Sequence, residues 1–438
     1  MKLFPMEGVL VIVLATWFVS TTHAQTVAPP CSPLSYGAKA DGRTKDTKAI
    51  QAAIDDCAKR GGGIVELSAG TYLSAPIELK SNITLQLDKG ATLLGTPDHE
   101  DYARITEFRV PGRQPLVGAT NATNIKISGE GTIDGSGQTW WDLARSIKGA
   151  GIMGSDQPRP RLVVFDHCRS VIVEGVTLQN GAFWQLNFYY SDDITVQNIK
   201  VLAPDKSLNS DGIDPFSSSN VRIDHVYVSV GDDDIAIKSG VANSPGPDAP
   251  CRNIKITNST FALGRGLSIG SEVVGGVQNL TVENVHFEGT YNGIRVKANR
   301  DRGGDVSNLV FRDISMKDVK FPIVITEIYN SPGDISSSLS PNLVAARKVE
   351  PAQPITKFTP RFHDITIENL TVTGATWAGE IGGLPEMPVQ NMVLKNVSIS
   401  SKNGLMVKDS NVSGENVVIR VLEGKDILSF PGANISIH

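Results

Sequence analysis

The chain has 438 residues, of which 42 are glycine, 40% are hydrophobic and only 6% are aromatic, and its formal net charge at pH 7 is −5. This composition suits thin stacked coils better than a globular core built on large side chains. A protein with a negative net charge and no basic stripe binds nucleic acid poorly, so a nucleic-acid-binding function is disfavoured.

Residues 1–24 have the pattern of a secretory signal peptide. Lys2 precedes an apolar run from Val9 to Val19, and Thr22-His23-Ala24 precedes the expected cleavage point. The run is too short to span a bilayer, which argues against a retained membrane anchor. We therefore expect a secreted, extracellular protein, or a periplasmic one if the source is bacterial.

Four cysteines suit an oxidising compartment: Cys31, Cys57, Cys168 and Cys251. Their spacing leaves all three possible pairings open. Because no Cys-x-x-Cys pair occurs, neither a zinc site nor a redox site is expected.

An amphipathic helix is predicted from about Thr47 to Lys59. One of its faces is apolar and consists of Ala49, Ile50, Ala53, Ile54 and Cys57. The run Gly61-Gly62-Gly63 ends the helix. A single helix ahead of a repeating pattern is expected to cap the open end of a solenoid.

The remainder of the chain repeats a short motif in which Asn or Asp precedes alternating aliphatic residues. Clear copies begin at Asp193, Asn220, Asn253, Asn279 and Asn308, and weaker copies begin at Asn82, Asn124, Ser170, Asp364 and Asn391. The first aliphatic residues of the clear copies are 27, 33, 26 and 29 residues apart, which are solenoid periods.

Each repeat unit reads as strand, turn, strand, because runs of period two are separated by Gly, Asn, Asp and Ser. We predict an all-β parallel β-helix in which each coil buries its aliphatic residues against its neighbours. The blade pattern of a propeller and the Leu/Asn spacing of a leucine-rich repeat are both missing from the sequence. No linker divides the repeat, so one domain is expected over residues 25–438, with a loop excursion at residues 331–360.

Charged residues recur at the same position within successive units of this repeat. Asp232 and Arg265 both lie 11 residues after their strand markers, so they should be neighbours on adjacent coils, whereas aligning residues 235–237 with residues 267–269 sets Arg265 beside Asp233. Either alignment places Arg265 next to the carboxylates. Aligning residues 235–238 with residues 294–297 places Arg295 and Lys297 on the outer face, above small side chains.

Asp211, Asp232 and Asp233 are therefore expected on one surface with two cations. Glycoside hydrolysis needs such a set, because one carboxylic acid protonates the leaving oxygen while another carboxylate activates water or attacks the sugar. Crowding also separates the pKa values of neighbouring carboxyl groups. A calcium loop at residues 207–218 is discounted, because Ser218 stands where a bidentate Glu is required.

With these motifs the chain resembles the polygalacturonases, the pectin-cutting glycoside hydrolases of family 28. Four segments carry the resemblance: Asn209-Ser210-Asp211, Gly231-Asp232-Asp233, Gly264-Arg265-Gly266 and Arg295-Val296-Lys297. It implies a single-stranded, right-handed parallel β-helix of the pectin-lyase-like type. It also implies inverting hydrolysis of α-1,4-galacturonosidic bonds without a cofactor or metal.

The resemblance implies a role for each matching residue. Asp232 would be the general acid, while Asp211 and Asp233 would hold and activate the water. Inversion would need the acid and base carboxyl groups about 6.5–9.5 Å apart. Substrate contacts would come from Asn209, Arg265, Arg295, Lys297 and Tyr329, with Arg295 and Lys297 binding a galacturonate carboxylate.

Arg265 departs from the family pattern, which has histidine at this position. A permanent cation beside Asp232 should favour the ionised carboxylate. The enzyme would then need acidic conditions, or act on a substituted or rhamnose-containing pectin, or be impaired.

Two other functions remain open. A catalytically silent β-helix that binds acidic polysaccharide is disfavoured because a polyanion binder would gain from losing the three Asp residues. A polysaccharide lyase is disfavoured because the cluster is a carboxylate set suited to hydrolysis. We expect a monomer with an acidic polysaccharide as its partner and no membrane partner, and the sequence does not distinguish internal from terminal cleavage.

Overall fold

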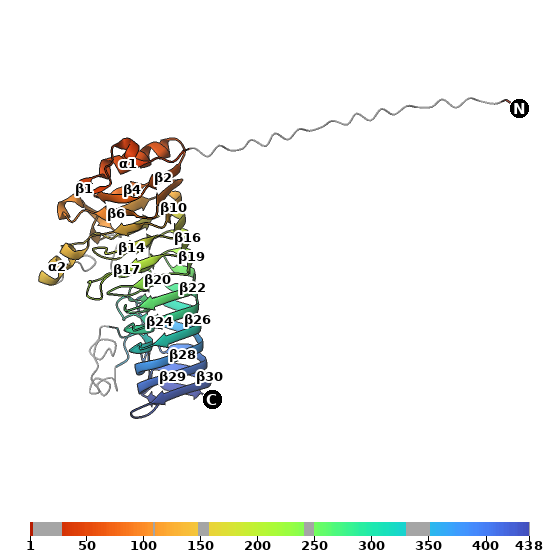
Figure 1. Ribbon diagram of the computed structural model, residues 1–438. Coiled ribbons are helices and arrows are strands. Elements are labelled where there is room, and N and C mark those ends of the chain that lie inside the picture. The colour runs from red at the N-terminus through yellow and green to blue at the C-terminus, as the bar shows by residue number, and fades with distance from the viewer. Residues whose placement is uncertain (3–28, 108–109, 148–156, 241–248, 330–350, 438) are drawn as a thin grey trace.

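The computed structural model describes residues 1–2, 29–107, 110–147, 157–240, 249–329 and 351–437. From residue 29 onward the described residues form one elongated stack of coils (Figure 1). The predicted signal peptide falls almost wholly outside the described residues, as do residues 331–350 of the predicted loop. Residues 351–360 contain no helix or strand. The domain boundary at residue 24 stays a prediction.

The strands stack in three parallel columns along the axis of the molecule. The first column contains β2 (Gly63–Leu67), β5 (Ile83–Leu87), β10 (Thr123–Gly129), β13 (Arg169–Glu174), β16 (Asp192–Gln197), β19 (Ser219–Asp224), β22 (Cys251–Ala262), β24 (Val277–Glu288), β26 (Asp305–Lys317), β28 (Arg361–Gly382), β29 (Val389–Lys408), β30 (Ser410–Val421) and β32 (Ala433–Ile437).

The second column begins with β1 (Asp41–Lys45), β3 (Gly70–Ser74), β6 (Ala91–Gly95), β11 (Thr132–Asp134), β14 (Thr177–Gln179), β17 (Lys200–Leu202) and β20 (Tyr227–Ser229). It continues into the second halves of β22, β24, β26, β28 and β29, which turn the corner between two columns. The predicted all-β parallel β-helix is thus confirmed.

The third column carries the candidate site. It contains β4 (Ile77–Leu79), β9 (Val117–Thr120), β12 (Val163–Asp166), β15 (Leu186–Tyr189), β18 (Ile213–Phe216), β21 (Ile235–Ile237), β23 (Leu267–Gly270), β25 (Asn292–Lys297) and β27 (Phe321–Thr326), followed by the ends of β28 and β29 and by β31 (Ile427–Ser429).

The register of the coils matches the repeat that the sequence predicts. The marker aliphatic residues pair in one continuous row: Ile194, Val221, Ile254, Leu280 and Leu309. Their side chains are buried in the main core. Coils of unequal length therefore keep the same strand register.

The Asn or Asp that opens each repeat has a local structural reason. Asn220, Asn253 and Asn279 adopt left-handed backbone conformations, which Asn tolerates better than most residues. Their side chains also form a ladder, because the amide of Asn253 donates to Asn220 and that of Asn279 donates to Asn253. The repeat motif thus encodes the bend between two columns.

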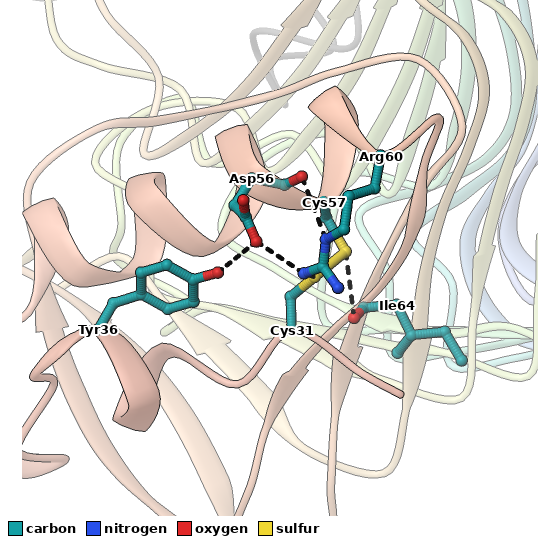
Figure 2. Close-up of a disulfide and its surroundings, with 6 residues drawn as sticks. All are labelled: Cys31, Tyr36, Asp56, Cys57, Arg60 and Ile64. Carbon is teal, nitrogen blue, oxygen red and sulfur yellow. Dashed lines mark hydrogen bonds and ion pairs between the residues drawn. A yellow bond between two sulfur atoms is a disulfide. The ribbon is translucent and has the colours of Figure 1, made fainter. Parts of the chain in front are cut away.

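The helix α1 (Thr47–Lys59) has the predicted bounds and lies over the first coils (Figure 1). Its predicted apolar face is buried. A disulfide joins Cys57 of α1 to Cys31, and Tyr36 donates a hydrogen bond of 2.6 Å to Asp56 on the same helix (Figure 2). The cap is thus tied covalently to the segment that precedes the first strand.

The other two cysteines, Cys168 and Cys251, are buried free thiols. Ser191 and Ser218 lie between the two thiols in one column. The strand register shows this, because each of these four residues is followed by a residue that pairs with its counterpart on the next coil. The thiols are three coils apart, which is roughly 14 Å at the usual strand spacing and beyond disulfide reach.

Some elements were not predicted. The helix α2 (Gln138–Ser146) projects from the stack and buries Trp140 and Trp141 (Figure 1). An antiparallel pair, β7 (Arg104–Glu107) and β8 (Val110–Arg113), and two short 3-10 helices, η1 (Pro33–Tyr36) and η2 (His99–Asp101), were also missed. Within the described ranges, neither α-helix is long and apolar enough to cross a membrane.

We expect Cys57→Ser to lower the free energy of unfolding by about 3 kcal/mol, because the disulfide restricts the unfolded chain over the segment that it closes. Urea unfolding followed by circular dichroism measures this change. The control is Tyr36→Phe, which removes only an exposed hydrogen bond. An unchanged unfolding midpoint in Cys57→Ser would show that the disulfide does not stabilise the cap.

Candidate functional site

The candidate site lies on the outer face of the third column. Ala236 of β21 pairs with Ser268 of β23, which in turn pairs with Arg295 of β25, as the sequence alignment of these strands predicts. The alternate residues of the same strands point into the core. The side chains of Ala236 and Ser268 are small and fully buried.

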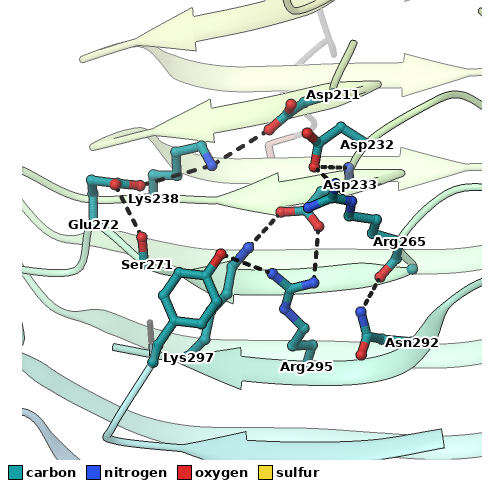
Figure 3. Close-up of polar contacts among 12 residues, drawn as sticks. Asp211, Asp232, Asp233, Lys238, Arg265, Ser271, Glu272, Asn292, Arg295 and Lys297 are labelled. Carbon is teal, nitrogen blue, oxygen red and sulfur yellow. Dashed lines mark hydrogen bonds and ion pairs between the residues drawn. The ribbon is translucent and has the colours of Figure 1, made fainter. Parts of the chain in front are cut away.

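Three carboxylates converge at the ends of the turns that precede these strands. Asp211 precedes β18, and Asp232 and Asp233 precede β21. One oxygen of each carboxylate lies within 4.8 Å of the other two. Figure 3 shows the three side chains pointing toward one another. The predicted convergence of these residues is confirmed, but their oxygens lie closer together than the 6.5–9.5 Å expected of an inverting pair.

Asp233 is held by two cations from β25. Its Oδ2 accepts a hydrogen bond of 2.7 Å from Lys297 Nζ, and its Oδ1 lies 3.6 Å from Arg295 Nη1. Burial opposes the charge on this carboxylate, but Lys297 and Arg295 more than offset it and hold the pKa of Asp233 well below its usual range. Asp233 is therefore ionised at every pH at which the protein would work.

Asp211 is in the opposite electrostatic situation. Burial raises its pKa to about 7, and the nearby charge of Asp232 adds to the increase. Lys238 Nζ, 3.6 Å from Asp211 Oδ2, only partly offsets these effects. Asp211 therefore keeps its proton over most of the acidic range.

Asp232 is the most accessible of the three carboxylates. Its side chain is 15% exposed, compared with 6% for Asp211 and 2% for Asp233. Arg265 Nε lies 3.6 Å from its Oδ1, which confirms the predicted proximity of Arg265 and Asp232. The Arg265 backbone N–H also donates to the Asp232 carbonyl, so the two residues occupy equivalent points on neighbouring coils.

Arg295 retains binding capacity beyond its contact with Asp233. Its Nε is buried and has no hydrogen-bond partner among the described residues. The guanidinium lies 5.5 Å from the ring centroid of Tyr329, and Lys297 Nζ lies 5.2 Å from the same centroid. The structure thus brings Arg295, Lys297 and Tyr329 together, as predicted.

Asn209 lies beside the site with its side chain already engaged. Its Oδ1 accepts a hydrogen bond of 2.8 Å from Arg159, which also donates to the carbonyls of Ala182 and Leu208. Asn209 has a left-handed backbone conformation. These contacts indicate that Asn209 shapes the turn that carries Asp211.

Sequence reasoning missed Lys238 as a site residue. Lys238 Nζ lies between Asp211 and Glu272, whose nearest oxygen is 3.9 Å away, and 5.1 Å from the ring centroid of Trp184. The signal was available, because Lys238 occupies the same offset from its strand as Lys297. Glu272 and Arg159 gave no such signal, because they reach the site from turns outside the repeat.

An open cleft of about 680 Å³ lies beside the site and runs past Arg265, Arg295 and Tyr329. It is lined by Asp205, Gly231, Leu263, Gly264, Arg265, Gly289, Tyr291, Arg295, Lys320 and Tyr329. A cleft of this kind can take a polymer lengthwise, whereas an enclosed pocket would take only a small molecule.

The three carboxylates are also the residues that could hold a metal ion. Each of them, however, already faces an ammonium or guanidinium group. These cations occupy the electrostatic role that a divalent ion would have. The donor set therefore fits acid–base chemistry better than metal coordination.

Comparison with known proteins agrees with this geometry. The family model described as "Glycosyl hydrolases family 28" matches residues 57–418. The chain is 31% identical over 423 residues to an endo-polygalacturonase of Pectobacterium carotovorum subsp. carotovorum, covering 92% of this chain and 96% of the relative.

Two solved structures are also similar. A polygalacturonase from Erwinia carotovora ssp. carotovora has a TM-score of 0.66 and 27% identity, over 93% of this chain and 96% of that one. An exopolygalacturonase from Thermotoga maritima has a TM-score of 0.70 and 25% identity, over 94% and 92%. The protein belongs to family 28 of the glycosyl hydrolases and is a glycoside hydrolase.

Proposed function

We propose that this glycoside hydrolase cleaves the α-1,4-galacturonosidic bonds of pectin or polygalacturonate outside the cell by an inverting acid–base mechanism. The observation that carries the proposal is the triad of Asp211, Asp232 and Asp233 beside two cations, Arg295 and Lys297, next to an open cleft that Arg295 lines. Carboxylates cut the glycosidic bond, and the cations suit a sugar that itself carries a carboxylate.

Asp232 acts as the general acid because it is the accessible carboxylate and borders the cleft wall formed by Arg265. Asp211 and Asp233 hold the attacking water between them. Burial and the nearby charge of Asp232 raise the pKa of Asp211 to about 7, so the cluster retains a proton on Asp211 over most of the acidic range. Asp233 stays ionised and accepts a hydrogen bond from the water.

The carboxylate of one galacturonate unit binds at Arg295. The support is the unpartnered Nε of this residue and its position on the cleft lining next to Tyr329. Lys297 contacts the substrate less directly, since its ammonium is already committed to Asp233 at 2.7 Å. We assign Lys297 a combined role, in which it keeps Asp233 ionised and adds positive charge near the substrate.

The stereochemical course is a separate part of the proposal. Carboxylate oxygens within 4.8 Å are nearer the spacing of retaining enzymes, whereas the resemblance implies inversion. We favour inversion because two cations balance the negative charge of the ionised Asp233 carboxylate, which makes it a poor nucleophile for a sugar carbon. Proton NMR of the first product distinguishes the two outcomes by its anomeric signal.

Secretion rests on the predicted signal peptide and on the disulfide, which suits an oxidising compartment.

The arginine at position 265 suggests two alternative functions. They are hydrolysis of a rhamnose-containing or substituted pectin, and binding of acidic polysaccharide without catalysis. Incubation with polygalacturonate and with rhamnogalacturonan, followed by sizing of the products, separates all three. New reducing ends on polygalacturonate without unsaturated products would support the main proposal.

Asp232→Asn is expected to lower kcat by roughly 10²–10⁴-fold, because the amide is nearly isosteric but cannot deliver a proton. Asp211→Asn and Asp233→Asn are expected to reduce kcat through loss of the activated water. The measurement is release of reducing ends from polygalacturonate. Asp193→Asn, at an exposed position of β16 with a left-handed backbone, is the matched control and should keep full activity. Near wild-type turnover in any one of the three variants would remove that residue from the mechanism.

Arg295→Ala is expected to weaken binding of oligogalacturonate about 10-fold or more, since a charge-assisted hydrogen bond contributes about 1.5–3 kcal/mol. Binding of the methyl-esterified oligomer should weaken much less. Lys297→Ala should lower both affinity and kcat, because Asp233 loses its nearest cation. Calorimetric titration compares the two ligands, with Arg312→Ala on an exposed strand position as the control. Equal losses for both ligands would mean that Arg295 does not read the carboxylate.

Arg265→His is expected to move the alkaline limb of the kcat/KM profile to higher pH. In the wild-type enzyme this limb should lie near pH 7 or below, where Asp211 loses the proton that burial retains. The positive charge of Arg265 interacts with Asp211 and favours its ionised form, whereas a neutral imidazole would not, so Asp211 keeps its proton to higher pH in the variant. A pH profile of both proteins tests this. An unmoved limb with a raised KM would instead make Arg265 a substrate contact.

A further inference from the structure

The cleft extends beyond the groups that the proposed mechanism uses. Along one wall of the cleft, backbone hydrogen bonds join the turns of successive coils. Arg265 donates to the Asp232 carbonyl, Tyr291 donates to Gly264, and Lys320 donates to Thr290. Tyr291 is therefore two coils, and Lys320 three coils, from Asp232, or about 10 and 14 Å at the usual strand spacing.

This part of the wall lies on the Arg295 side of the catalytic carboxylates. Asp211 lies on the opposite side of Asp232, one coil nearer the N-terminal end, because β18 pairs with β21. A polymer that places one acidic sugar at Arg295 and continues in the same direction passes Tyr291 and Lys320. Both residues line the same 680 Å³ cleft.

Tyr291 offers a supported aromatic surface. Its ring lies 5.4 Å, centroid to centroid, from the ring of Phe321. It also packs against an apolar cluster on the outer face of the third column that contains Phe321, Val324, Trp377 and Met406. A ring held in this way loses little conformational entropy when the apolar face of a sugar packs on it.

Lys320 adds a positive charge at the edge of that surface. Its Nζ lies 4.9 Å from the Tyr291 ring centroid, and its side chain is exposed. Within the described part of the chain it forms no ion pair, unlike the cations of the catalytic cluster. The adjacent Gly289 has no side chain, and even an added Cβ would meet no atom within 4 Å, so the approach to this pair is open.

We infer that Tyr291 and Lys320 form a separate subsite for a further acidic sugar, beyond the unit bound at Arg295. The sugar ring packs on Tyr291 while its carboxylate pairs with Lys320. This inference rests on the proposed function. It makes the affinity of the enzyme depend on substrate length, because only an oligomer that extends past Arg295 reaches the pair.

The test measures KM and kcat for a series of oligogalacturonates from the trimer upward. The variants are Lys320→Ala and Tyr291→Ala, and the control is Lys395→Ala, an exposed lysine on β29 that does not line the cleft. For long oligomers Lys320→Ala should raise KM about three- to fivefold, as expected for a partly exposed ion pair. The rise should vanish for the shortest substrates, and it should shrink at high salt.

The remaining measurements distinguish the contribution of Tyr291 from that of Lys320, and failure of the subsite from failure of the proposed function. Tyr291→Phe should behave as wild type, whereas Tyr291→Ala should raise KM for long oligomers at any salt concentration. If the wild-type enzyme cleaves these oligomers and both alanine variants keep the wild-type length dependence, the subsite is refuted while the proposed function stands. If the wild-type enzyme cleaves none of them, the proposed function fails and this inference fails with it.

Discussion

The parallel hydrogen-bond ladder between coils is the constraint on which the rest of this structure depends. A strand that pairs with the coils on both sides cannot slip by one residue without turning its aliphatic side chains outward. The continuous row from Ile194 to Leu309 shows this register held across five coils. Residues far apart in sequence, such as Asp233 and Lys297, are therefore held within hydrogen-bonding distance on one face.

The charges of the site depend on the same scaffold. Burying a carboxylate such as Asp233 is costly unless a cation is supplied at short range. Here Lys297 and Arg295 come from β25, two coils away, on a strand whose alternate residues are anchored in the core. The rigid register lets the protein keep Asp233 ionised while the pKa of its neighbour Asp211 is raised, so carboxyl groups in different protonation states lie within a few ångströms of each other.

Much of this arrangement could be predicted from the sequence, because the features concerned are periodic. The pairing of Ser268 with Arg295 and the proximity of Arg265 to Asp232 follow from counting residues along repeats. The bounds of α1 follow from the helical period of its apolar face and from the glycines that come after it. Elements between repeats follow no such count. The helix α2 forms where Trp140 can pack against His99 and Tyr102, contacts that depend on the folded coils.

Other features depend on geometry at a scale finer than the repeat. The separation of the three carboxylates is set by the turn at Asp211, whose shape depends on Arg159 and Asn209. Likewise, cysteine spacing left three pairings open, and only the position of α1 against the first strands selects Cys31 with Cys57. Periodicity thus predicts which residues meet, whereas the turns determine how closely they meet.

The two buried thiols give this solenoid an internal reporter. Burial raises the pKa of Cys168 to about 11 and that of Cys251 to about 12, so both are held in the protonated, unreactive form. Cys168 immediately precedes β13 and Cys251 is the first residue of β22, and the turns that carry Asp211 and Asp232 lie between these two strands in the chain. A thiol reagent can modify either cysteine only while its coil is open to solvent. The rates of alkylation would therefore measure how often the stack opens on each side of the catalytic coils, without any probe having been introduced.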